Sequence, residues 1–238
     1  AAARSGRGFV ILGGVARPWK TLDSVETDEG TLELRQRGER DFLITVAGRT
    51  LMTSTATRSE LEVARVACAD LGKHAAPRVL IGWLGMGFTL AAALKVVGPD
   101  AEATVAELIP EVVEWNRGPL GDRSGRPLDD PRTRVYVGDV ADLLRGGEYR
   151  YDVIALDVDN GPEGLTSEGN DWLYSMAGIA AARGALRPGG VLAYWSAGPD
   201  RAFERLLRRC GLAVEGVVTR AHGGKGARHT IWLATAPR

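Results

Sequence analysis

A glycine-rich turn after an apolar run is the first feature of this 238-residue sequence that could bind a ligand. The run Val79-Leu-Ile81 leads into Gly82-Trp-Leu-Gly85-Met-Gly87, and an apolar helical segment, residues 88–97, follows. Because glycine has no Cβ, backbone N–H groups in such a turn can approach a ligand closely, and the helix N-terminus adds a positive dipole end. The turn predicts a nucleotide-like cradle, although its spacing is not the dinucleotide G-x-G-x-x-G and a purely structural turn would also use glycine.

Two acidic residues follow the next two predicted strands. Glu107 ends a strand 20 residues after Gly87, where a carboxylate can accept hydrogen bonds from both hydroxyls of a ribose. The same residue would also suit the N-terminus of the following helix, through the helix dipole. Asp139 follows Gly138 at the end of a third strand and is placed to accept a hydrogen bond from the exocyclic amine of adenine. Turn, Glu107 and Asp139 together predict a nucleoside site.

Polar residues also follow a fourth strand, at positions expected to face the reacting end of the ligand. Asp157 directly ends the apolar run and is the candidate general base or orienting residue, with Asp159 and Asn160 assisting. Turn formation by Asp159 and Asn160 would explain the same pattern. Asn170 and Tyr174 are further candidates for lining this cleft, although a helix cap and a half-buried aromatic ring account for them equally well.

The elements that position these residues differ between the two parts of the chain. Short, partly alternating segments at 31–35, 41–46 and 50–54 predict a small antiparallel β-unit within residues 1–57. A helix over 59–71 begins the second part, residues 58–238, in which apolar strands alternate with helices. That alternation predicts an α/β, Rossmann-like, mostly parallel sheet whose strand carboxyl ends share one edge. The segment 118–132 is predicted to be a long loop.

Composition excludes several classes of function. Thirty basic residues balance 30 acidic ones, so no overall positive charge favours nucleic acid or anionic lipid. Two distant cysteines and three scattered histidines predict neither a disulfide framework nor a metal site. The longest apolar run falls far short of the roughly 20 residues that span a bilayer. We therefore expect a cytoplasmic protein with a small-molecule partner and without nucleic-acid or membrane binding.

These motifs resemble those of the class I S-adenosylmethionine-dependent transferases, and within them the spermidine synthase (polyamine aminopropyltransferase) branch. The resemblance rests on residues 79–87, Glu107, Gly138-Asp139, Leu156-Asp157 and Leu186-Arg-Pro-Gly-Gly190. It implies a seven-stranded sheet with a reversed final pair, a small N-terminal β-domain and a homodimer. It also implies that the cofactor is bounded by the turn, that Glu107 and Asp139 hold its ribose and adenine, and that Asp157 lies beside the nucleophile. The turn residues concerned are Gly82, Gly85, Met86 and Gly87.

The sequence departs from that branch at three places. Met86 stands where the branch has an Asp that binds the amine of the aminopropyl group, and Asn160 stands at the second acid of a D-x-x-D pair. Arg58-Ser59-Glu60 replaces a Tyr-(Gln/His)-Glu motif, which makes Arg58 and Glu60 candidate substrate-binding residues. Each change removes a group expected to recognise a polycation, and Arg58 would repel one.

The departures favour a methyltransferase that uses S-adenosylmethionine and a small-molecule acceptor on a spermidine synthase-like scaffold. Methyl transfer is an in-line displacement, so positioning of the acceptor can provide most of the acceleration. Two alternatives stay open. One is aminopropyl transfer from decarboxylated S-adenosylmethionine, with Asp157, Asp159 and Glu60 at a diamine site. The other is a nucleoside-binding module without catalysis. The glycine spacing disfavours a nicotinamide dehydrogenase.

Overall fold

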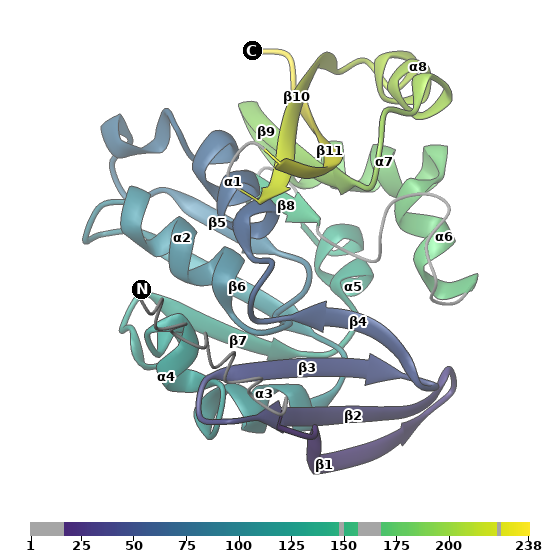
Figure 1. Ribbon diagram of the computed structural model, residues 1–238. Helices are drawn as coiled ribbons and strands as arrows, with labels where there is room; N and C mark the ends of the chain where they lie inside the picture. The colour runs from purple at the N-terminus through teal and green to yellow at the C-terminus, as the bar shows by residue number, and fades with distance from the viewer. Residues whose placement is uncertain (1–16, 148–149, 157–167, 223–224) are drawn as a thin grey trace, which may run out of the picture.

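Two β-sheets make up the framework of the computed structural model, which describes residues 17–147, 150–156, 168–222 and 225–238 (Figure 1). The first sheet is antiparallel, in the order β1-β2-β3-β4. Its strands are β1 (Lys20–Thr27), β2 (Gly30–Arg37), β3 (Asp41–Val46) and β4 (Arg49–Thr53).

The second sheet has seven strands in the order β10-β11-β9-β8-β5-β6-β7. They are β5 (Arg78–Ile81), β6 (Glu102–Glu107), β7 (Thr133–Val137), β8 (Tyr151–Leu156), β9 (Leu186–Ser196), β10 (Ala213–His222) and β11 (Lys225–Thr235). Strands β5 to β9 pair in parallel, whereas β11 is antiparallel to both β9 and β10. The predicted fold class, including the reversed final pair, is confirmed.

Helices cover both faces of the larger sheet (Figure 1). They are α1 (Arg58–Ala67), α2 (Phe88–Val96), α3 (Pro110–Arg117), α4 (Gly121–Ser124), α5 (Val140–Arg145), α6 (Glu168–Tyr174), α7 (Met176–Ala185) and α8 (Arg201–Arg209), with 3₁₀ turns η1 (Leu71–Lys73) and η2 (Pro127–Asp129). Helix α2 is buried along most of its length, from Phe88 to Leu94, which explains why its sequence is apolar on every side.

Several boundaries differ from the sequence-based expectations. Strand β1 was not among the predicted strands, because it lies at the edge of its sheet and most of its residues are exposed, so that no apolar alternation marks it. The expected loop 118–132 contains α4 and η2. The segment Pro188-Gly-Gly190 lies inside β9, although Pro-Gly-Gly is typical of a turn.

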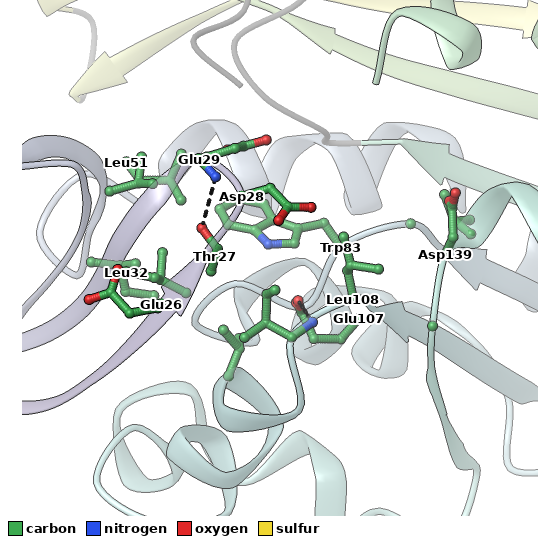
Figure 2. Close-up of a pocket in the computed structure, with 17 residues that line it drawn as sticks. Glu26, Thr27, Asp28, Glu29, Leu32, Leu51, Trp83, Glu107, Leu108 and Asp139 are labelled. Atoms are coloured by element: carbon green, nitrogen blue, oxygen red, sulfur yellow. Dashed lines mark hydrogen bonds between the residues drawn. The ribbon is translucent and has the colours of Figure 1, made fainter. Parts of the chain in front are cut away.

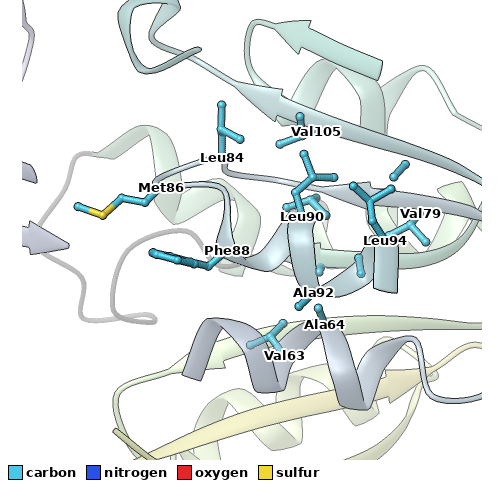
Figure 3. Packing of buried hydrophobic residues seen from close by; sticks show 14 of the residues in the cluster. Val63, Ala64, Val79, Leu84, Met86, Phe88, Leu90, Ala92, Leu94 and Val105 are labelled. Carbon is cyan, nitrogen blue, oxygen red and sulfur yellow. The ribbon is translucent and has the colours of Figure 1, made fainter. Parts of the chain in front are cut away.

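The two sheets share one apolar core. Leu34 and Ile44 of the first sheet belong to the same buried cluster as Met86 and Phe88 of the second part of the chain. Figure 3 shows the centre of this cluster, where α1 packs against α2. A second cluster lies under α5, α7 and α8. The domain boundary at residue 57 stays a prediction, and the core extends across it.

Two hydrogen bonds also join the first sheet to the second part of the chain. The Trp115 indole on α3 donates from Nε1 to Asp23 Oδ2 on β1 (2.7 Å), and Arg123 donates from Nη2 to the Ser54 carbonyl oxygen just after β4 (2.7 Å). Trp115 is buried. These bonds fix the first sheet against the carboxyl edge of the second, where the predicted ligand residues lie.

Length and hydropathy of the helices bear on membrane binding. Within the described residues, no helix is both long and apolar enough to cross a bilayer.

We expect Trp115→Phe to destabilise the fold by about 1.5–3 kcal/mol, because it removes a buried donor to a charged acceptor while keeping an aromatic ring. Urea denaturation measures the change. Thr21→Val is the matched control, since it removes an exposed hydrogen bond from the same strand to Glu33, and it should change stability by less than about 0.5 kcal/mol. Equal effects of the two substitutions would contradict a structural role for the Trp115 to Asp23 bond.

Candidate active site

The glycine turn between β5 and α2 closes tightly against β8. The Gly82 N–H donates to the Ala155 carbonyl oxygen (2.8 Å), and a Cβ at Gly82 would lie 2.5 Å from Leu156 Cδ2. Gly85 and Gly87 have φ angles of +52° and +80°, a region that residues with a Cβ rarely adopt. Glycine is therefore required here by backbone conformation and by close packing of the turn.

Asn116 holds the turn from behind. Its Nδ2 donates to the Gly85 carbonyl oxygen (2.8 Å) and to the Val112 carbonyl oxygen (2.9 Å), and the side chain is buried. A Cβ at Gly87 would meet Asn116 Oδ1 at 2.8 Å. The sequence analysis did not identify Asn116, although an asparagine on the buried face of the helix 110–117 was a usable signal.

Glu107 lies at the end of β6 and is almost fully buried, with 2% of its surface exposed. Its Oε2 accepts from the Leu84 N–H (3.2 Å) and its Oε1 from the Ile109 N–H (3.0 Å). Burial raises the pKa of Glu107 to about 7, against the opposing effect of these and neighbouring N–H groups. Each carboxylate oxygen has a second lone pair. The residue can therefore accept two hydroxyl donors while it holds the turn.

Asp139 lies after β7 and is the N-cap of α5. Its Oδ1 accepts from the Ala141 N–H (2.8 Å), which satisfies one of the unpaired donors at the start of that helix. The residue also lines the same pocket as Glu107. It is therefore both a structural cap and a candidate ligand for an amine.

A pocket of about 420 Å³ joins these residues to the first sheet (Figure 2). It is lined by Glu26, Thr27, Asp28, Glu29, Leu32, Ile44, Val46, Leu51, Gly82, Trp83, Glu107, Leu108, Ile109, Val112, Gly138, Asp139 and Val140. Five of these residues are acidic, and none of the described residues in the lining is Lys, Arg or His. Even with Glu107 only partly ionised at pH 7 because of its raised pKa, such a concentration of acidic groups between apolar walls attracts cations.

The acidic hairpin tip, residues 26–29, supplies three of the five acids. It is the turn between β1 and β2, and Thr27 shapes it by donating from Oγ1 to the Gly30 carbonyl oxygen (2.7 Å) and accepting from the Glu29 N–H (3.3 Å). Sequence reasoning missed the tip because nothing in the sequence indicated that the first sheet would lie over the nucleoside site. The run Glu-Thr-Asp-Glu before Gly30 was its only signal.

Trp83 was also missed as a pocket residue. Its half-buried ring lies against Gly85, with a Cβ at Gly85 falling 3.3 Å from the indole carbons. Figure 2 shows the indole between the hairpin tip and Asp139. An aromatic face beside carboxylates suits a cationic ligand.

The remaining predicted site residues lie elsewhere. Met86 is fully buried in the core and is not part of the pocket lining. Arg58 is exposed and Glu60 half-buried on the first turn of α1, and Tyr174 packs its ring against Tyr194 and Phe203. Three candidates lie outside the described residues, namely Asp157, Asp159 and Asn160. The side chain of Asn170 is likewise outside them.

Several solved structures share the fold of this chain. Spermidine synthase from Thermotoga maritima superposes with a TM-score of 0.71 at 20% identity, over 90% of this chain and 72% of that one. The fold is that of the spermidine synthases. A spermidine synthase in complex with the transition-state analogue AdoDATO gives a TM-score of 0.70 at 20% identity, with the same coverage. A probable spermidine synthase from Corynebacterium glutamicum gives 0.65 at 18% identity, over 91% of this chain and 79% of that one.

Sequence comparison points in the same direction over a shorter span. The chain is 30% identical over 134 residues to a polyamine aminopropyltransferase from Korarchaeum cryptofilum, a match that covers 55% of this chain and 40% of that relative. No protein-family model matches the chain. The spermidine synthase fold is therefore established over nearly the whole chain, and sequence similarity over about half of it.

Glu107→Gln should change how stability depends on pH. Because the pKa of about 7 in the folded protein lies above the ordinary value of 4.5, the protonated carboxyl stabilises the fold fully below pH 4.5, and that contribution is lost as pH rises through 7. We expect the free energy of unfolding of Glu107→Gln, relative to that of the wild type, to rise by about 2 kcal/mol between pH 5 and pH 8. Urea denaturation at both pH values measures it. Glu102→Gln, at the half-buried first residue of the same strand, should show no such gain.

The two roles of Asp139 can be separated by substitution. Asp139→Ser keeps an N-cap oxygen, so its thermal stability should match that of wild type, whereas Asp139→Ala should lose about 1 kcal/mol. Both variants lose the carboxylate, so both should bind adenosine about tenfold more weakly by calorimetry if Asp139 accepts from the adenine amine. If Asp139→Ser binds adenosine as tightly as the wild type, Asp139 caps the helix but does not bind the adenine amine.

Proposed function

We propose that this protein transfers an aminopropyl group from decarboxylated S-adenosylmethionine to a small amine. The observation that carries the proposal is the charge of the pocket, in which five acidic residues and no basic residue of the described chain surround the candidate nucleoside site. The charge of the pocket thus favours aminopropyl transfer, the alternative, over the methyl transfer that the sequence alone favoured.

The two possible donors differ in one charged group. Both carry a sulfonium and an ammonium, and S-adenosylmethionine also carries an α-carboxylate. In proteins a carboxylate is stabilised by cationic side chains or backbone N–H groups. Carboxylates of the hairpin tip, in a partly apolar pocket, would instead repel it. The decarboxylated donor has only positive groups and suits the lining better.

Met86, in place of an acid in the glycine turn, is only a weak argument against aminopropyl transfer because of how the turn is packed. Met86 lies in the core, and its side chain does not line the pocket. Asp28 and Glu29 of the hairpin tip bring acidic groups to the pocket from another element. Although position 86 is not acidic, the pocket still contains carboxylates that can bind an ammonium group.

The chemistry needs little beyond positioning. The acceptor nitrogen attacks the propyl carbon bound to the sulfonium sulfur, a C–N bond forms, and the C–S bond breaks with its electron pair remaining on sulfur. Because a primary amine is protonated at pH 7, the acceptor first loses one proton to a base. The products of the displacement are methylthioadenosine and a secondary ammonium. Asp157, which follows β8 in the sequence and lies outside the described residues, is the base expected from the sequence. Near-attack placement of the two substrates supplies most of the acceleration in such a displacement.

The similarity to a polyamine aminopropyltransferase supports the proposal from an independent side. Methyl transfer is a second candidate because Arg58 stands where the spermidine synthase branch has a tyrosine, and its positive charge would repel a polycation. The two functions release different by-products. Mass spectrometry after incubation with an amine and either donor should detect methylthioadenosine, whereas S-adenosylhomocysteine would indicate methyl transfer. Saturable nucleoside binding without either by-product would indicate a binding module.

We predict that the decarboxylated donor binds at least about tenfold more tightly than S-adenosylmethionine, because of the repulsion between its carboxylate and the pocket. Calorimetry with each donor measures the preference. The double substitution Glu26→Gln and Asp28→Asn should reduce the ratio between the affinities for the two donors. Glu39→Gln removes a charge from the β2–β3 turn, outside the pocket, and should leave it unchanged. Tighter binding of S-adenosylmethionine by the wild-type protein would refute the proposed donor.

A further inference from the structure

Two rings that touch near the end of β9 each carry a nitrogen that has no hydrogen-bond partner among the described residues. The rings of Trp195 on β9 and His229 on β11 meet edge to face, with their centroids 4.7 Å apart. Trp195 has 9% of its surface exposed. Within the described part of the chain, neither Trp195 Nε1 nor His229 Nδ1 has a hydrogen-bond partner, although both atoms are buried.

The pair lies at the edge where the reaction would take place. Strands β8 and β9 are parallel with Leu156 opposite Tyr194, so Trp195 is one position beyond the end of β8. Ser196 pairs with Thr230, which places His229 still further along the same edge. The donor pocket lies at the ends of β5, β6 and β7, on the other side of β8. A donor reaching toward β8 would thus meet an acceptor that lies along β9.

Helix α1 covers the same face of the sheet. Trp195 and Ile231 belong to the cluster that includes Val63 and Ala64 of α1. His229 lies two residues from Ile231 and therefore on the same face of β11. Glu60 is three residues before Val63, so the half-buried Glu60 continues the sheet-facing side of α1 toward this edge. Trp195 is consequently covered by α1, and the half-buried His229 lies on the same face nearer the strand ends.

The chemistry of the two nitrogens defines what they can bind. Trp195 Nε1 carries an N–H and can only donate, and a buried donor without a partner costs about 1–3 kcal/mol. Burial lowers the pKa of His229, which favours the neutral ring. In the tautomer that carries its proton on Nε2, Nδ1 supplies a lone pair. A donor and an acceptor on two touching rings match an uncharged group that both accepts and donates. A hydroxyl group meets both requirements, whereas an ammonium group has no lone pair for the indole.

We propose that Trp195 and His229 bind a hydroxyl group at the far end of the acceptor, so that the acceptor is an amino alcohol rather than a diamine. The inference rests on the proposed aminopropyl transfer and specifies its second substrate. It agrees with the exposed Arg58 on the first turn of α1, which would repel a second positive charge. The donor pocket is acidic. Trp195 and His229 instead present ring nitrogens to the distal end of the acceptor, while the half-buried Glu60 of α1 lies toward the same edge.

Three acceptors of equal chain length test the proposal: a linear aminobutanol, butylamine and linear diaminobutane. With the decarboxylated donor, we expect kcat/KM to be about tenfold higher for aminobutanol than for butylamine, the scale of one hydrogen bond to a buried group. Diaminobutane, whose distal amine is protonated at pH 7, should be poorer than aminobutanol. Trp195→Phe and His229→Phe should each reduce the ratio of aminobutanol to butylamine toward one, with unchanged methylthioadenosine affinity.

Trp232→Phe is the matched control. Its indole Nε1 is also buried without a partner among the described residues, yet Trp232 belongs to the cluster on the opposite face of the sheet. The variant should keep the wild-type ratio. A wild-type preference for diaminobutane, or an unchanged ratio in Trp195→Phe, would overturn the proposal.

Failure of the proposed function gives a different result. In that case no amine would yield methylthioadenosine with the wild-type protein. The acceptor site is then tested by calorimetry of the same three amines in the presence of methylthioadenosine. Aminobutanol binding that Trp195→Phe weakens and Trp232→Phe does not would support the site, and absence of that difference would overturn it.

Discussion

The buried carboxylate of Glu107 connects the backbone of the glycine turn to the end of β6. One of its oxygens accepts from the Leu84 N–H and the other from the Ile109 N–H. Both bonds require an acceptor at a position where water has almost no access, and the carboxylate accepts them at the cost of a raised pKa. The turn, the start of α3 and the wall of the pocket therefore depend on one group, which remains able to accept hydrogen bonds from a ligand. Ligand recognition and local structure are not separable at this residue.

Strand ends could be predicted well because their physics is local. A continuous apolar run followed by Gly or an acidic residue marks β5, β6 and β7, and Glu107 and Asp139 were placed in the pocket region from that pattern alone. Asn116 and Trp83 were not found, because their roles depend on which atoms approach them in three dimensions. Met86 shows the reverse error in reasoning, since its alignment with a binding residue said nothing of its packing in the core.

The hairpin tip could not be predicted for a different reason. Its strand β1 is an exposed edge with no apolar alternation, and the contact that brings it to the nucleoside site is made by an apolar core shared between two sheets and by the bond from Trp115 to Asp23. Contacts of this kind join residues that are far apart in the chain, and no local pattern records them. An inventory of acids within the Rossmann-like half alone therefore underestimates the negative charge of the pocket.

Three of the five acids in the pocket lie within four consecutive residues of one turn. The nucleoside cradle, by contrast, is distributed over the ends of three strands and is constrained by packing against Leu156, Asn116 and Pro127. Changes in a surface turn cost little in folding free energy, whereas changes in the cradle disturb the core. If the pocket binds the proposed donor, substitutions in this one turn can therefore alter which donor is preferred at little cost in folding free energy, whereas substitutions in the cradle cannot.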